Sequence, residues 1–441
     1  ILVNFIRQIK SMENDNLNPS ILGNLNVYDF RNLQLKTQYI IKRYECDCIE
    51  INKINKINKI KTTYDSLVGD KVGLIKRIKL DILDQTFPPC VFLKASLPKS
   101  KKMVGALDFT WENAYVRTIG EFVERYCWEN YSKDLFVAKW DELPKEKQIS
   151  LETINRYKDW QYKKNINIKK LIESDVISWI MARNMYGEDE KYIPAEFVIN
   201  YKMLSNKSLH YISSTGVAAG VESYDKIIEK AFFELIERDT ITRNIYIKRG
   251  ISKIHDPLID ENYHISLCKA YGLNVDFYYF SNDYGIHVIM CRLVSLDVSD
   301  DIISYGYACD KNTMECIIKS LKEALLMRRA ILQDFNTNKS RSRFLYTARD
   351  SKNSFFENIF LDSNVSIKDI EKKEVNTKLL RNIKKETYFV DITLDNIKAL
   401  GWSVISAYNP YMLDFAFNKE MLMLKNIPQE FERLNSGFMQ F

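Results

Sequence analysis

The sequence Glu-Leu-Ile-Glu-Arg-Asp occupies residues 234–239, inside a segment, 224–247, whose apolar spacing predicts a helix. Residues three apart on a helix share a face, so Glu234 and Glu237 present two carboxylates side by side, with Arg238 next in line. The apolar residues of the segment recur with helical spacing and are expected to point inward: Ile227, Ile228, Ala231, Phe232, Leu235 and Ile236.

Small residues precede this predicted helix. Residues 213–220 read Ser-Ser-Thr-Gly-Val-Ala-Ala-Gly. Small side chains allow a backbone to come close to a ligand or to another helix. We expect the stretch to be either a tight strand-to-helix turn or such a close approach.

The pattern Glu-x-x-Glu-Arg occurs a second time, as Glu121, Glu124 and Arg125. It lies in residues 110–130, which also read as a helix. One copy alone is usually a solvated face with a local salt bridge. Two pairs that face one pocket would bind a hard divalent cation such as Mg²⁺ through oxygen, and this would hold a nucleoside triphosphate without a glycine-rich phosphate loop. The apolar stripe of this helix is expected at Ala114, Ile119, Phe122, Val123 and Tyr126.

A third helix is predicted at residues 313–333, with Asn312 as its cap. It carries Glu323 and Arg328, which we expect to reach the same site, although a charged helix of this kind is ordinary on its own. Helices and strands are mixed without strict β-α-β repeats, so the α+β class is favoured. The predicted strands are 72–78, 90–93, 275–280, 287–290, 303–307 and 402–407.

The chain divides into an N-terminal extension, residues 1–64, and a main domain, residues 65–441. The extension contains a low-complexity segment, 49–61, in which Ile-Asn-Lys repeats with a period of three. In the main domain, residues 145–190 read as helix-rich and highly charged. We expect them to form a peripheral helical insertion.

Composition narrows the functional classes. Apolar residues make up 46% of the 441 residues, and the net charge of +6 is spread along the chain, which is weak evidence for a nucleic-acid binder. The eight cysteines and four histidines show no zinc-binding pattern, so most cysteines read as reduced core residues of a cytosolic protein. The sequence has no apolar run of 18 residues for a membrane span and no cleavable signal pattern.

Taken together, these segments resemble the YcaO family. The resemblance rests on Gly-Glu-x-x-Glu-Arg at 120–125, Ser-x-Gly-x-Ala-Ala-Gly at 214–220 and Glu-x-x-Glu-Arg-Asp at 234–239. Farther on, Gly306 to Ala308 and Glu323 to Arg328 follow in the same order as in the family. The resemblance covers roughly residues 65–415 and implies a YcaO-type α+β fold, in which mixed and antiparallel sheets and packed helices carry an ATP site.

The resemblance implies an ATP- and Mg²⁺-dependent enzyme that acts on peptide backbones. Family members typically form thiazolines and oxazolines from Cys, Ser or Thr of a ribosomally made precursor peptide. The side chain attacks the preceding carbonyl, ATP phosphorylates the oxygen of the adduct, and phosphate leaves. Two alternatives stay open: a YcaO-type enzyme that forms thioamides or amidines, and a non-catalytic subunit that docks a peptide or a partner.

The resemblance also assigns roles to residues. Glu121, Glu124, Glu234 and Glu237 would bind Mg²⁺, while Arg125 and Arg238 would orient these carboxylates or touch phosphate. Glu124, Glu237 and Arg238 are the catalytic candidates. The nucleotide-binding candidates are Ser213, Ser214, Glu121, Glu234, Arg125, Glu323 and Arg328.

The chain departs from the family pattern in two places. The family's third region often has a histidine near the position of Asp310 and a glutamine at Leu326 or Met327. Azoline-forming members often end in a proline-rich tail, whereas the last 31 residues here contain one proline, Pro428. We expect the tail to be missing from a trimmed chain, which also lacks an initiator methionine.

The resemblance further implies partners. Fused family members carry a large ThiF-like domain that captures the leader peptide, and the roughly 64 residues before the core are too few for it. We therefore expect a stand-alone cyclodehydratase subunit with a separate ThiF-like docking partner and a flavin-dependent dehydrogenase downstream. Thioamide formation would instead need a TfuA-type partner and a sulfur source. Members are often dimers, so a homodimer is expected, with no nucleic acid and no membrane involved.

Overall fold

The structure divides by its internal contacts into two units, Ile1–Thr62 and Thr63–Phe441. The computed structural model describes two strands of the first unit, β1 (Asn24–Asp29) and β2 (Gln34–Tyr39), which pair antiparallel. The low-complexity segment 49–61 lies outside the described residues. In the second unit the described residues are 64–69, 73–81, 83, 87–98, 102–164, 168–200, 216–247, 250–296, 302–336 and 363–414.

A five-stranded sheet forms one half of the second unit, in the order β13-β12-β11-β10-β14. Its strands pair antiparallel, except that β10 and β14 run parallel. Successive side chains of a strand point to opposite faces of the sheet. Here the side chains of each face pack into a separate core cluster, so both faces are buried. The strands are β10 (Ile251–Ile254), β11 (Leu273–Phe280), β12 (His287–Ser295), β13 (Ile303–Asp310) and β14 (Ser363–Val365).

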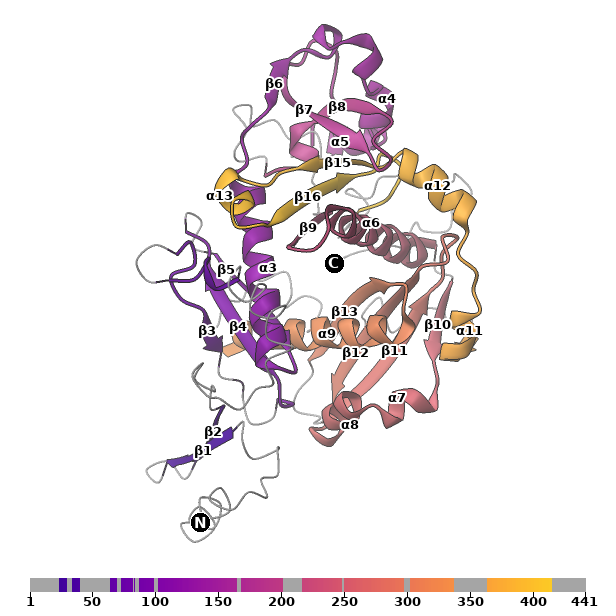
Figure 1. Cartoon of the computed structure of the whole chain (residues 1–441). Coiled ribbons are helices and arrows are strands. Elements are labelled where there is room, and N and C mark those ends of the chain that lie inside the picture. The colour runs from indigo at the N-terminus through magenta and orange to yellow at the C-terminus, as the bar shows by residue number, and fades with distance from the viewer. Residues whose placement is uncertain are drawn as a thin grey trace. The chain divides into compact units, whose positions relative to one another are not determined.

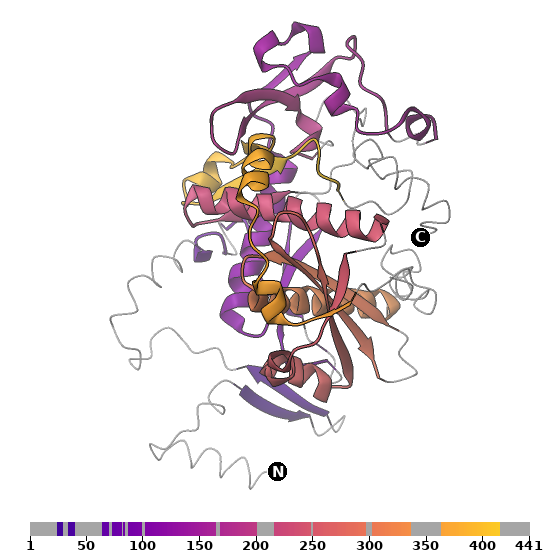
Figure 2. The ribbon, with the colours of Figure 1, turned by 90° about the vertical axis from the view of Figure 1, so that its right-hand side faces the viewer.

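Two long helices, α6 (Tyr224–Ile247) and α9 (Thr313–Asn336), cover the two faces of this sheet. Figures 1 and 2 show α6 lying between the sheet and the strands β9 and β16. On β12, Val288 and Met290 pack in the cluster around α6, while Ile289 and Cys291 pack in the cluster around α9. The alternation along one strand therefore supplies the core of both layers.

The predicted apolar face of α6 and the predicted cap of α9 are confirmed. All six inward residues predicted for α6 are buried, with Ile227 and Ile236 at 0% exposure. At the start of α9 the Asn312 side chain accepts a hydrogen bond from the Glu315 backbone N–H at 2.9 Å. Gly306 lets β13 approach α9, since a Cβ there would lie 2.1 Å from the Ala324 backbone nitrogen.

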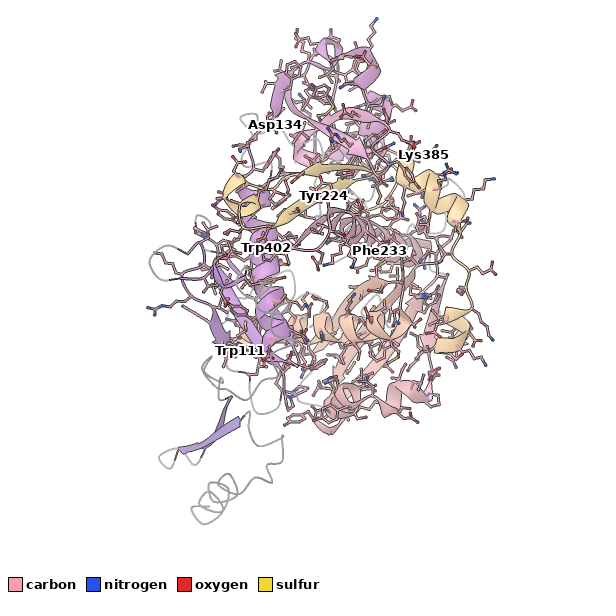
Figure 3. All side chains as sticks on the ribbon, in the orientation of Figure 1. Trp111, Asp134, Tyr224, Phe233, Lys385 and Trp402 are labelled. Atoms are coloured by element: carbon pink, nitrogen blue, oxygen red, sulfur yellow. The ribbon has the colours of Figure 1, made fainter. Side chains whose placement is uncertain are left out.

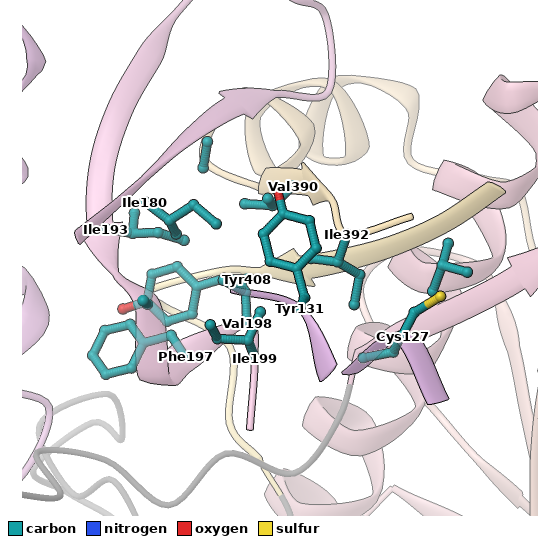
Figure 4. Packing of buried hydrophobic residues seen from close by; sticks show 14 of the residues in the cluster. Cys127, Tyr131, Ile180, Ile193, Phe197, Val198, Ile199, Val390, Ile392 and Tyr408 are labelled. Atoms are coloured by element: carbon teal, nitrogen blue, oxygen red, sulfur yellow. The ribbon is translucent and has the colours of Figure 1, made fainter. Parts of the chain in front are cut away.

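A six-stranded sheet forms the other half, in the order β6-β7-β15-β16-β9, with β8 beside β7. Figure 4 shows its core, where Tyr131, Val390, Ile392 and Tyr408 pack together. The strands are β6 (Leu135–Ala138), β7 (Ile177–Asn184), β8 (Glu190–Pro194), β9 (Val217–Gly220), β15 (Tyr388–Asp391) and β16 (Ser403–Tyr408).

The prediction of a helical insertion at residues 145–190 is wrong in its second half. The segment holds two short helices, α4 (Leu151–Ile154) and α5 (Asp159–Lys164), and then the strand β7. This strand lies between β6 and β15 in the sheet, and its Trp179 is fully buried. The apolar residues of β7 belong to the core of the sheet rather than to a peripheral element.

Helix α3 (Trp111–Asn130) connects the six-stranded sheet with a smaller sheet of three strands. The Thr110 side chain caps its first turn by accepting from the Asn113 backbone N–H. Trp402, labelled in Figure 3, is buried in the same cluster as Phe122 of α3. The small sheet consists of β3 (Lys79–Asp81), β4 (Val91–Ser96) and β5 (Met103–Asp108).

The predicted strand at 72–78 is largely wrong, because within its described part only Ile75 forms a bridge, with Val68, and β3 begins at Lys79. The other predicted strands overlap β4, β11, β12, β13 and β16, with 90–93 and 402–407 each starting one residue early, and the α+β class is confirmed. No helix in the described part of the chain is long and apolar enough to cross a membrane. The remaining helices are η2 (Trp140–Glu142), η3 (Lys145–Lys147), η4 (Ala195–Phe197), α7 (Pro257–Glu261), α8 (Tyr263–Ala270), α11 (Ile367–Glu371), α12 (Thr377–Lys385) and α13 (Asp395–Lys398).

Candidate active site

Three helices bring the predicted carboxylates together. Glu124 of α3 interacts electrostatically with Glu234 and Arg238 of α6, although about 110 residues separate them in sequence. Glu237 of α6 interacts in the same way with Glu323 of α9, and Glu323 with Glu121. The two Glu-x-x-Glu-Arg motifs therefore face each other, and α9 adds a fifth carboxylate.

Each motif contains an ion pair between two residues that lie four positions apart on the helix. The Arg125 Nε donates to Glu121 Oε1 at 2.9 Å, and the Arg238 Nε donates to Glu234 Oε1 at 3.2 Å. Arg125 also lies 3.5 Å from a carboxylate oxygen of Glu124. These contacts match one of the two roles predicted for the arginines, the orientation of the carboxylates.

In the described part of the small-residue stretch, residues 217–220 form a strand, and Gly216 makes the close approach to a helix that was one of the two expectations. Residues 217–220 form β9, which pairs antiparallel with β16, and the Val217 backbone N–H donates to Glu234 Oε2 at 3.1 Å. A Cβ at Gly216 would lie 2.7 Å from the Leu235 side chain, so glycine lets this strand pack directly onto α6. Ser213 and Ser214, predicted to contact the nucleotide, lie outside the described residues.

The electrostatics of the site favour a bound cation. Burial and the charge of Glu121 raise the pKa of Glu124 well above its usual range. Burial raises the pKa of Glu237 to about 8. The charges of Glu234 and Glu323 also raise this pKa, and the charge of Arg238 lowers it. Crowded carboxylates that resist ionisation gain from an added positive charge, and oxygen donors are those that Mg²⁺ prefers. The residues present therefore fit the cation.

The described residues do not yet form a finished metal site. Among them, no three Asp, Glu, His or Cys side chains are grouped closely enough to hold a metal ion. Arg125 and Arg238 pair with oxygens of Glu121 and Glu234. Metal binding by all four glutamates stays a prediction, and it requires these oxygens to exchange an arginine for the cation.

Arg328 lies away from the contacts just described. Its guanidinium donates to the Ile302 carbonyl oxygen at 3.2 Å, and the residue is buried beside the start of β13. Five residues separate it from Glu323, which places the two side chains on different faces of α9. The nucleotide-binding role predicted for Arg328 stays a prediction.

The sequence analysis missed three charged residues next to the glutamates. Arg117 of α3 donates to Glu323 Oε1 at 2.7 Å and to Asp108 Oδ2 at 3.3 Å. Lys322 of α9 donates to the same Asp108 oxygen at 2.8 Å. Arg117 precedes Glu121 by one helical turn, so the same spacing rule that paired the glutamates could have found it. Nothing in the local sequence marks Asp108.

A protein-family model described as YcaO cyclodehydratase, ATP- and Mg²⁺-binding, matches residues 108–413. The chain belongs to the YcaO family. This finding confirms the predicted family, its enzyme class and its two cofactors, ATP and Mg²⁺. A comparison with curated proteins gives no match.

Several solved structures share the fold. A heterocyclase in complex with substrate and cofactor matches with a TM-score of 0.67 at 17% identity, over 94% of this chain and 62% of that one. This chain thus spans less than two thirds of that heterocyclase. The YcaO protein from Methanopyrus kandleri bound with AMPPCP and Mg²⁺ matches with a TM-score of 0.57 at 13% identity, over 86% of this chain and 94% of that one.

A third similar structure is a multisubunit assembly. The E. coli microcin synthetase McbBCD complex with pro-MccB17 bound matches with a TM-score of 0.63 at 14% identity, over 80% of this chain and 92% of the matched chain. At such identities the likeness shows the shared fold.

Proposed function

We propose that this YcaO protein uses ATP and Mg²⁺ to form thiazolines or oxazolines from Cys, Ser or Thr of a ribosomally made precursor peptide. The observation that carries the proposal is the meeting of both complete Glu-x-x-Glu-Arg motifs, on α3 and α6, with Glu323 of α9. An incomplete set of carboxylates would hold Mg²⁺ poorly. All four motif glutamates are present here.

The chemistry requires a poor leaving group to depart. ATP, when bound, would supply the phosphoryl group that is transferred to the oxygen of the cyclised amide. That oxygen would then leave as part of phosphate, which is a good leaving group. The chain's own task is to neutralise charge and fix geometry. Mg²⁺ would be held by the four motif glutamates, Glu121, Glu124, Glu234 and Glu237. Arg125 would keep Glu121 oriented, and Arg238 would keep Glu234 oriented. The Glu237 carboxyl, with its pKa near 8, would release a proton as the cation binds.

Two alternatives use the same site differently. Thioamide or amidine formation would need the same phosphorylation with another nucleophile, and relatives at 13–17% identity do not separate these reactions. A non-catalytic docking subunit would not need the complete set of motif glutamates, so their presence counts against it.

The proposed partners follow from the relatives. One matched structure is a microcin synthetase assembly with its pro-peptide bound. By analogy, we propose that this chain works on a microcin- or bacteriocin-like precursor with a ThiF-like docking partner and a flavin-dependent dehydrogenase. We further propose that residues 65–441 act as the catalytic unit and that the chain forms a homodimer.

Calorimetric titration of ATP, with and without Mg²⁺, tests the nucleotide site. We expect Mg²⁺-dependent binding by the wild type and its loss in Glu124→Gln. A matched control is Glu229→Gln, which removes a carboxylate of α6 that pairs with Lys311 instead. Binding that survives in Glu124→Gln at wild-type strength would contradict the metal assignment. Absence of binding by the wild type would favour the docking subunit.

A further inference from the structure

Arg117 links α3 to α9 but belongs to neither glutamate motif. Its Nη2 donates to Glu323 Oε1 at 2.7 Å, and its Nη1 donates to the Leu107 carbonyl at 2.9 Å and to Asp108 Oδ2 at 3.3 Å. One nitrogen of the planar guanidinium thus binds α9, and the other binds the end of β5. In Figure 1, α9 runs across the lower part of α3.

Asp108 is a fixed support for this arginine. It is the last residue of β5, is 2% exposed, and accepts from Lys322 as well as from Arg117. Although burial opposes its ionisation, the hydrogen bond from Lys322 and the charges of Lys322 and Arg117 keep the pKa of Asp108 below its usual range. A buried carboxylate that stays charged fixes the position of the arginine beside it.

Glu323 is the side chain whose position depends on Arg117. Its side chain is 42% exposed, so the surrounding core does not fix its conformation. Its neighbours include the carboxylate of Glu121, which repels it. Arg117 supplies the ion pair resolved for Glu323.

We propose that Arg117 is a positioning residue, which holds Glu323 in the nucleotide site and depends on Asp108 and Lys322 for its own position. The inference rests on the proposed ATP site, because the ligand in question is ATP with Mg²⁺. Arg117 acts through Glu323 and is not assigned a contact with the nucleotide.

The chain contains a matched control. Arg329, also at the α9 interface, donates to Asp81 Oδ2 at 2.9 Å, and Lys94 shares this carboxylate at 3.1 Å. Asp81 ends β3 as Asp108 ends β5, so each bridge ties α9 to the small sheet through one aspartate and two cations. Arg117 differs because it also contacts a carboxylate of the site. A purely structural role would therefore give Arg117→Met and Arg329→Met the same phenotype.

The experiment measures Mg²⁺-dependent ATP binding by calorimetry, and thermal unfolding, for the wild type, Arg117→Met, Arg117→Lys and Arg329→Met. We expect Arg117→Met to weaken ATP binding about tenfold and Arg117→Lys to recover part of it, because lysine keeps the charge but not the fork. Arg329→Met should bind ATP as the wild type does, with a comparable loss of melting temperature. Equal affinities for the two methionine variants would overturn the inference.

A double-mutant cycle adds a readout that a structural role would not move. If Arg117 acts through Glu323, Arg117→Met should have little further effect on ATP affinity in a Glu323→Gln background. Additive losses would overturn the inference. If Arg117→Met does not fold, Arg117→Lys decides, and wild-type affinity in that variant contradicts the proposal. A wild type that binds no ATP contradicts the proposed function itself, and the inference with it.

Discussion

The two Glu-x-x-Glu-Arg copies have the same sequence pattern but different surroundings. In the α3 copy, Glu121 and Arg125 keep 36% and 30% of their side chains exposed, and the ion pair between them lies within one helix. In the α6 copy, Glu234 and Arg238 are 24% and 15% exposed, and Val217 of β9 also holds Glu234. The α6 copy is therefore built into the fold, whereas the α3 copy is carried by its own helix.

The residue after each motif increases this difference. Asp239 of α6 is 1% exposed and accepts hydrogen bonds from the Tyr284 hydroxyl, Arg243 and the Leu413 backbone N–H. The same position in α3 is Tyr126, a half-buried aromatic that stacks on Phe122. Two separate segments, at Tyr284 and at Leu413, thus meet α6 immediately beside Arg238. We infer that α6 is the rigid half of the site and α3 the adjustable half.

The largest expected effect is the loss of a glutamate from the rigid half. Glu237→Gln should reduce ATP turnover at least about 100-fold, because it removes a charge from a preorganised, partly desolvated site. Glu121→Gln, in the more exposed half, should cost less. ATP turnover and thermal unfolding of both variants measure this. Turnover by Glu237→Gln at the wild-type rate would show that the metal assignment is wrong.

The second comparison concerns stability. Asp239→Ala should lower the free energy of unfolding by about 3 kcal/mol, because it leaves buried donors of Tyr284, Arg243 and Leu413 without their acceptor. Tyr126→Phe, at the matching position of α3, should stay within about 0.5 kcal/mol of the wild type. Denaturant unfolding of the two variants measures the difference. Similar losses for both would contradict the division into a rigid and an adjustable half.

Local features of this fold could be predicted from sequence, and long-range ones could not. The bounds of α6 match the predicted 224–247, because its apolar residues follow a helical period within the segment itself. The strand β7 was missed, since its short apolar run follows the charged helices α4 and α5 and is recognisable only once it pairs with β6 and β15.

The candidate site shows the same limit. The four motif glutamates were predicted from helical spacing and a family resemblance, and the structure brings them together. The contact between Arg117 and Glu323 joins residues 206 positions apart, so no local pattern could reveal it. The nucleotide-binding role of Arg328 stays a prediction, since Arg328 lies five positions from Glu323 and so on a different face of α9.

The third comparison uses pH. Glu237 has a folded pKa of about 8 against a usual value of 4.5. The folded protein therefore holds this proton after the unfolded chain has lost it, and the stabilising contribution, complete below pH 4.5, is lost as pH rises through 8. Binding of Mg²⁺ requires the charged form, so the apparent Mg²⁺ affinity should rise up to about tenfold per pH unit between pH 6 and 8. Glu237→Gln should reduce this pH-dependent change in stability, and the part that remains would belong to Glu124.

Calorimetry of Mg²⁺–ATP binding in two buffers with different ionisation enthalpies measures the proton released. We expect close to one proton at pH 7 for the wild type, since most of Glu237 is protonated there. Asp310→Asn is a suitable control variant, because this carboxyl has a pKa below its usual range and holds no proton at neutral pH. Proton release that persists in Glu237→Gln would assign it to another group, with Glu124 the next candidate.

The smallest expected effect separates the two arginines. Arg238→Lys should weaken Mg²⁺-dependent ATP binding about tenfold, because Arg238 is the less exposed arginine and its fork holds Glu234 through two nitrogens. Arg125→Lys should cost only about threefold, since the ion pair it loses lies on a more solvated helix. Arg183→Lys is the control, because the Arg183 side chain is 65% exposed and pairs with Glu190, outside the candidate site. Equal losses of ATP affinity for Arg125→Lys and Arg238→Lys would mean that the burial of the arginine does not determine its effect on binding. The α3 half would then be as tightly constrained during nucleotide binding as the α6 half.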